Sequence, residues 1–115
     1  MGALFYGNDA EPITIPDHAL SHLKILFASK LRRGESFSFT WKHGADQVRG
    51  RSTIWIHPAI PMRFVFEEEV AAPLDQELLQ DFARRANSST GLAIDFNEFD
   101  SPSAVERRAD LRRVA

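Results

Sequence analysis

The chain has 115 residues, a length typical of one domain, and 43% of them are hydrophobic while 26% are charged. This balance argues against a disordered or fibrous protein. The net charge of −2 disfavours a strongly basic nucleic-acid scaffold, and Cys 0 excludes disulfides, thiolate metal sites and a cysteine nucleophile. We therefore expect one globular domain in a reducing compartment.

The first residues carry neither the basic segment nor the long apolar run of a secretory signal. No apolar stretch approaches the ~20 residues that a helix needs to cross a bilayer. These features predict a cytoplasmic protein with no membrane partner.

The first elements are expected to be a β-hairpin and a helix. A short apolar run at 3–6 ends in a turn, and the segment 11–15 alternates polar with apolar residues, as strands do. A helix is predicted over 17–33, with Asp17 as its cap and Gly34 after its end. Its apolar stripe has spacings of three and four: Leu20, Leu23, Phe27 and Leu31.

A second hairpin is expected from strands at 37–42 and 52–58, because both alternate apolar with polar residues around a glycine-bounded loop. If Lys42 faces Arg51, the apolar sides of the two strands agree. A shift by two residues satisfies the same parity, so the pattern leaves the register open.

The second half predicts a third strand at 63–66, which can return beside the second strand of that hairpin, then a helix and a last strand at 92–96. Asp75 is the expected helix cap. The helix would bury a stripe of Leu78, Leu79, Phe82 and Ala86.

Together these elements predict an α+β fold of two layers, a mainly antiparallel sheet with two helices on one face, in the order ββαβββαβ. The domain is expected over 1–99, and 100–115 is an Arg-rich tail, either frayed or forming a short surface helix. Six residues are expected to be buried: Leu23, Phe27, Phe39, Ile54, Phe64 and Phe82.

Several blocks of the sequence resemble a family of short actinobacterial proteins of unknown function. They are Met1–Gly7, His22–Trp41, Thr53–Pro58 and Ala86–Ser88, in that order. Members often carry the label ATP-dependent DNA ligase. The resemblance implies no known catalytic residue.

The residues themselves do not support ligase chemistry. Ligases of that class form a lysyl-adenylate within a Lys-x-Asp-Gly motif, whereas Lys24, Lys30 and Lys42 each lead into a different sequence. The chain is also too short for a nucleotidyltransferase domain together with a DNA-clamping domain. If the label applies, it fits an accessory protein or a remnant.

Other chemistries have weak signals. His18 and His22 share an i, i+4 spacing, but no third ligand is evident, and both are expected on the surface of the first helix. Ser52 and Thr53 precede His57, but a straight strand spaces these side chains too widely for a triad. The glycines are scattered at turns and do not form a phosphate loop. We expect no metal and no cofactor, and the sequence favours a non-catalytic role.

The leading prediction is a protein-interaction or homodimer module. By strand parity, Trp55 points away from the core side of its strand, together with Thr53 and His57. Both predicted helices are needed on the core side, so Trp55 would stay exposed on a helix-free face, next to Val65. Exposed tryptophans of this kind are frequent interface anchors.

The alternative is a nucleic-acid-binding accessory protein. Two groups of basic residues flank the strand that carries Trp41, which could then serve as a stacking platform. These residues are Lys30, Arg32, Arg33, Lys42, Arg49 and Arg51. The simpler interpretation is that they end a helix and decorate a hairpin while Trp41 belongs to the core.

Overall fold

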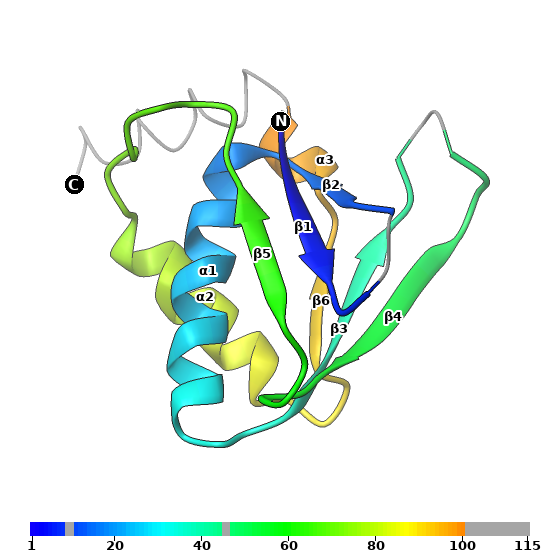
Figure 1. Ribbon diagram of the computed structural model, residues 1–115, viewed down its shortest axis with the longest axis vertical. Coiled ribbons are helices and arrows are strands. Elements are labelled where there is room, and N and C mark those ends of the chain that lie inside the picture. The colour runs from blue at the N-terminus through cyan, green and yellow to red at the C-terminus, as the bar shows by residue number, and fades with distance from the viewer. Residues whose placement is uncertain (9–10, 45–46, 101–115) are drawn as a thin grey trace.

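The computed structural model describes residues 1–8, 11–44 and 47–100 (Figure 1). Its strands are β1 (Gly2–Tyr6), β2 (Ile13–Ile15), β3 (Phe37–Lys42), β4 (Arg51–Ile56), β5 (Met62–Val65) and β6 (Leu92–Ile94). Its helices are α1 (Asp17–Arg32), α2 (Gln76–Ala86) and α3 (Asn97–Asp100). The predicted α+β class and the order ββαβββαβ are confirmed, with α3 added after the last strand. The predicted Arg-rich tail lies, from residue 101 onward, outside the described residues.

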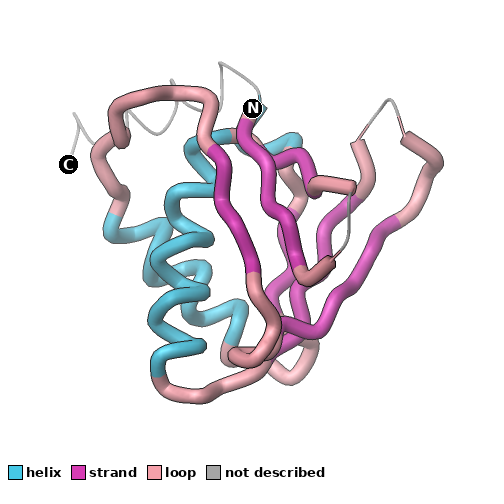
Figure 2. The backbone as a smooth tube through the Cα atoms, viewed as in Figure 1, coloured by secondary structure: helices cyan, strands magenta, loops and turns pink. Residues whose placement is uncertain are grey.

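The strands form two three-stranded sheets, β2-β1-β5 and β4-β3-β6, rather than one. All pairings are antiparallel except that of β3 with β6, which is parallel. The strand expected to return beside β4 is β5, and it pairs with β1 instead (Figure 2). That expectation was wrong because alternation assigns the faces of a strand but not its neighbour. Val65 is consequently in the other sheet from Trp55.

The second hairpin has the first of the two registers that parity allows. Phe37 lies opposite Ile56, and Phe39 lies opposite Ile54. Lys42 lies opposite Arg51, so the ladder runs without a bulge from one end to the other. The inward sides of β3 and β4 are thereby both apolar.

Helix α1 does not begin as predicted. Pro16 occupies the N-cap position, and no side chain caps the helix there. The Asp17 carboxylate accepts hydrogen bonds from the backbone N–H groups of Glu67, at 3.2 Å, and Glu68, at 3.0 Å. It therefore ties the chain after β5 to the start of α1. In α2 the predicted cap is confirmed, because the Asp75 carboxylate accepts from the N–H of Glu77 at 3.0 Å.

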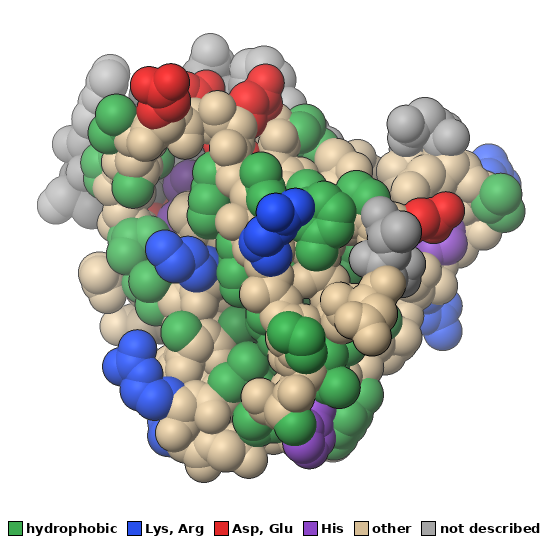
Figure 3. All heavy atoms as spheres, viewed as in Figure 1, with side chains coloured by type: hydrophobic (Ala, Val, Ile, Leu, Met, Phe, Trp, Pro, Cys, Tyr) green, Lys and Arg blue, Asp and Glu red, His purple; other side chains and the backbone are tan. Residues whose placement is uncertain are grey.

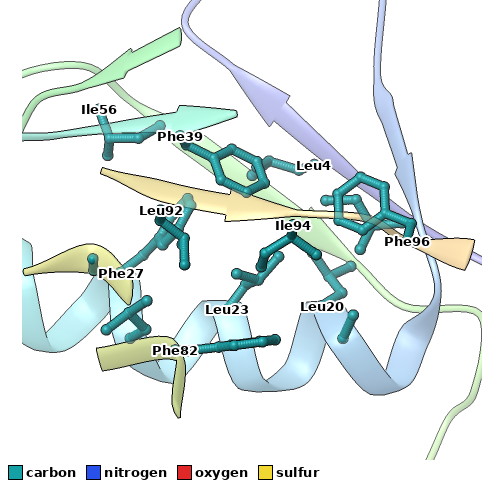
Figure 4. Close-up of a cluster of buried hydrophobic side chains, with 14 of the residues drawn as sticks. Leu4, Leu20, Leu23, Phe27, Phe39, Ile56, Phe82, Leu92, Ile94 and Phe96 are labelled. Carbon is teal, nitrogen blue, oxygen red and sulfur yellow. The ribbon is translucent and has the colours of Figure 1, made fainter. Parts of the chain in front are cut away.

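The two longer helices gather on one side of the strands and pack against each other (Figures 1 and 2). Both sheets and both helices contribute to one apolar core (Figure 4). Leu23, Phe27, Phe39 and Phe82 are buried as predicted, whereas Ile54 and Phe64 are half-buried and pack against the core from its edge.

Candidate binding surface

The face of the β4-β3-β6 sheet that points away from the core is the first candidate site. We call it the outer face and define it by the residues that alternate with the buried ones. They are Ser38, Thr40 and Lys42 on β3, Arg51, Thr53 and Trp55 on β4, and Ala93 on β6. No helix within the described ranges covers this face (Figure 1).

Trp55 is the most prominent side chain of the outer face, with 61% of its surface exposed. Its strand neighbour Thr53 is also exposed, as is His57 just beyond the end of β4. The prediction that Trp55 points away from the core is therefore confirmed in its geometry. The reason is the register, which turns Ile56 inward and leaves Trp55 opposite Ser38.

The outer face changes in character along its strands. Beyond Trp55, the hydroxyls of Thr40 and Thr53 bond to each other across the ladder at 2.7 Å. Next come Lys42 and Arg51 side by side, a like-charged pair. Successive residues on one side of a strand are about 7 Å apart, so the face is aromatic at one end, neutral and polar in the middle, and basic at the other end.

Tyr6 closes the open edge of β4 beside Trp55. The backbone of β4 alternates between groups facing β3 and groups facing the edge, and the carbonyl of Trp55 and the N–H of His57 face the edge. The Tyr6 hydroxyl donates to the Trp55 carbonyl at 2.5 Å and accepts from the His57 N–H at 3.1 Å. These two backbone groups of the edge are therefore already bonded, while the Trp55 side chain stays exposed on the face of the sheet.

The predicted basic residues do not form one group. Arg32 and Arg33 lie at the end of α1, and the β3–β4 hairpin tip lies at the opposite end of the molecule (Figure 1). Lys30 is 6% exposed, its ammonium donating to the Asn87 side chain and lying 3.3 Å from the Glu35 carboxylate. It supports the turn after α1 and offers no surface charge.

The remaining basic residues line a surface groove beside the outer face, between the hairpin and β6. Lys42, Arg49 and Arg51 come from the hairpin. Arg85, which sequence reasoning missed, is the last-turn arginine of α2 and donates to the Ala93 carbonyl at 3.3 Å. Only the connection from α2 to β6 brings it there, so no local motif could have indicated it. Trp41 lies on the other side of β3, half-buried against Phe39.

The histidine pair of α1 is not a surface pair. His22 is 0% exposed, so its predicted surface position was wrong. Its Nδ1 lies 2.7 Å from the His18 carbonyl, and its Nε2 accepts the N–H of Asp75 at 2.8 Å. The buried arc of α1 is wider than its leucine stripe because the segment leading into α2 also packs on it. Among the described residues, no group of three or more His, Asp or Glu could hold a metal ion.

We expect His22→Ala to destabilise the fold by about 1–3 kcal/mol, because it removes the acceptor of a backbone N–H in a dry environment. His18→Ala, a change of the half-buried neighbour on the same helix, is the matched control and should cost less. Urea unfolding of both variants measures the difference. Equal losses would contradict the bonding role given to His22.

Comparison with family models places the chain among domains whose function is not established. The model of DUF7882, a domain of unknown function, matches residues 1–97. The chain belongs to this family. Neither the search of curated proteins nor that of solved structures found a significant match. Membership of DUF7882 agrees with the expected family of unknown function and supplies no site residues. No helix in the described part of the chain has the length and apolarity to span a membrane.

Proposed function

We propose that this DUF7882 protein is a binding module that holds an acidic protein segment on the outer face. The observation that carries the proposal is the 61% exposure of Trp55 on a sheet face that no helix of the described residues covers. Burying a tryptophan removes up to about 150–250 Å² of surface from water, and tryptophan and arginine are enriched among interface hot spots. The proposed binding requires no catalytic group.

The outer face is better suited to this role than the corresponding face of the other sheet. There Phe5 is half-buried, and the Arg63 guanidinium lies over its ring, 4.7 Å from the centroid. Within the described residues, no such cation lies over Trp55. A partner therefore meets a bare aromatic ring on one sheet and an occupied ring on the other.

Charge favours an acidic partner. Arg51 and Arg49 follow Trp55 toward the hairpin tip, and Asp95, the one acidic side chain among the described residues of the adjoining groove, lies 3.7 Å from the Lys42 ammonium. Arg85 is likewise paired, with the Asp81 carboxylate at 2.9 Å. The excess positive charge of the groove's described residues therefore comes from Arg49 and Arg51. Complementary charge accelerates encounter and selects among partners.

A single-stranded nucleic acid is the second candidate. The specific observation in its favour is that Lys42, Arg49, Arg51 and Arg85 line one groove at the basic end of the sheet whose outer face carries the exposed Trp55 ring. Such platforms combine a basic groove with stacking side chains. The ligase label would then reflect an accessory role, since the chain lacks the Lys-x-Asp-Gly motif.

Site-specific cross-linking tests the proposal in cells. A photo-reactive benzoylphenylalanine at Thr53 stands on the outer face beside Trp55, and one at Gln80 stands on the exposed side of α2 as the matched control. We expect adducts from position 53 that protease removes and nuclease does not. Adducts that nuclease removes would favour the second candidate, and an adduct of twice the chain mass would identify a homodimer. No adduct at position 53 beyond that at position 80 would contradict both candidates.

Trp55→Ala is expected to abolish those adducts while leaving the free energy of unfolding within about 0.5 kcal/mol of the unmodified protein, as is usual at exposed sites. Thermal melts of the variant, measured beside cross-linking, separate binding from stability. A large loss of stability without loss of adducts would show that Trp55 serves the fold instead.

A further inference from the structure

A cleft of about 1030 Å³ opens on the opposite side of the β3–β4 hairpin from Trp55. One wall comes from the β2 region and the other from the hairpin, which projects from the body of the molecule (Figure 3). Its size is that of a site for a small molecule. Its lining is mixed: the apolar side chains of Ile13, Trp41, Ile54 and Phe96 lie beside polar ones that include Glu11, Lys42, His43 and Ser52.

His43 and Ser52 meet in this cleft. The His43 Nε2 lies 2.7 Å from the Ser52 hydroxyl, and the His43 Nδ1 lies 2.8 Å from the Val48 carbonyl. A nucleophile bonded to a base, with the base oriented by a third group, is the arrangement of hydroxyl-based covalent catalysis. The sequence placed His57 near Ser52 but too far along the strand to serve as its base, whereas the closed hairpin brings His43 to Ser52.

When the His43 imidazole is neutral, the two hydrogen bonds determine its tautomer. A carbonyl only accepts, so Nδ1 carries the proton that it donates to Val48. Neutral Nε2 then has the lone pair, and it accepts the hydrogen bond from the Ser52 hydroxyl. This is the tautomer in which a histidine takes a proton from serine.

The hairpin also positions the pair. The N–H of His43 donates to the Gly50 carbonyl at 2.9 Å, which places the imidazole one ladder step beyond Ser52 on the cleft side. Gly50 has a φ of +139°, and a Cβ there would lie 3.8 Å from the His43 Nδ1. The ring therefore rests over a residue without a side chain. The Gln47 side-chain oxygen accepts from the Gly44 N–H at 3.1 Å, so its amide N–H groups are donors on the same rim.

We propose that Ser52 and His43 form a nucleophile–base pair that hydrolyses small carboxylic esters with an apolar acyl chain. Ser52 Oγ bonds to the acyl carbon as its proton moves to His43 Nε2. The carbon–oxygen bond to the alcohol then breaks, and the alcohol leaves with that proton. Water next gives a proton to His43 Nε2 and its oxygen to the acyl carbon. The bond between that carbon and Ser52 Oγ then breaks, His43 returns the proton to Oγ, and the carboxylic acid leaves. The apolar part of the lining, formed by Ile13, Trp41, Ile54 and Phe96, receives the acyl chain.

The alternative is that the hydrogen bond between His43 and Ser52 only stabilises the hairpin. The reactivity of Ser52 distinguishes this structural role from a catalytic one. A fluorophosphonate reagent phosphonylates an activated serine, with a new oxygen–phosphorus bond and loss of fluoride. We expect one adduct per chain, mapped to Ser52 by peptide mass spectrometry. Ser52→Ala should remove it, and Ser29→Ala, a change of an exposed serine on α1, should not.

His43→Ala should slow the labelling by about 10²–10⁴-fold, the usual contribution of a general base. Hydrolysis of p-nitrophenyl butyrate by the full chain should fall in parallel. Circular dichroism and thermal melts verify that each variant is folded. If His43→Ala does not fold, His43→Gln takes its place. Labelling at Ser52 that is absent, or that is equally fast without His43, would overturn the proposal and leave the outer face untouched.

Discussion

Phe27→Ala is expected to lower the free energy of unfolding by about 3–5 kcal/mol, the usual cost of truncating a buried phenylalanine. The ring is 1% exposed and meets Phe37 and Phe39 edge-on, at centroid distances of 5.1 and 5.5 Å. It also meets Phe64 of the other sheet at 6.0 Å. One side chain of α1 thus joins both sheets, and its loss leaves a cavity that neither sheet can fill alone.

Ile25→Ala is the control for this change, because Ile25 lies on the same helix with 41% of its surface exposed. It should cost about 0.5 kcal/mol or less. Urea unfolding gives both values, with the midpoint shifting and the slope unchanged if the native fold is kept. Similar losses for the two variants would contradict the central position of Phe27.

The hydrophobic patterns predicted the helices and strands well because each pattern depends only on residues within one segment. The stripe of α1 and the alternation in the two hairpin strands required no knowledge of the rest of the chain. The sequence also limited the register of the β3–β4 hairpin to two options, because the loop joins two strands that pair with each other. The Phe39 and Ile54 pair followed directly from that register.

The partners of β5 and β6 could not be read in the same way. Their apolar residues need one covered face, and several strands could have supplied a neighbour. The choice of β1 for β5, and of β3 in parallel for β6, depends on how α1 and α2 pack against each other and against the strands. That packing is a property of the whole chain.

The same distinction divides the candidate sites. Trp55 was found because parity alone turns it outward. Lys30 and His22 were misplaced because their burial depends on the segments around α2 that pack beside α1. The sequence offered no base for Ser52, because the contact with His43 arises only when the hairpin closes.

Gly91→Ala is expected to be among the most damaging small changes in the chain. Gly91 has a φ of +78°, a conformation that costs a side chain about 1–2 kcal/mol. A Cβ there would also lie 2.0 Å from the Ser38 hydroxyl oxygen and 2.8 Å from the Ser38 carbonyl. Since Leu92 begins the pairing of β6 with β3 at the next residue, relief of the clash would pull the two strands apart.

Gly34→Ala separates the two causes. Gly34 has a nearly identical φ of +73°, but no atom lies within 4 Å of the place that a Cβ would take, so that variant carries the backbone strain alone. We expect Gly91→Ala to lose more stability than Gly34→Ala in urea unfolding, with the excess measuring the contact with β3. Adding Ser38→Ala should recover part of that excess, because the nearest atom is removed while the Ser38 carbonyl remains. If the two glycine variants lose equal stability, Gly91 contributes only its backbone conformation and the close approach of β6 to β3 is not needed for the fold.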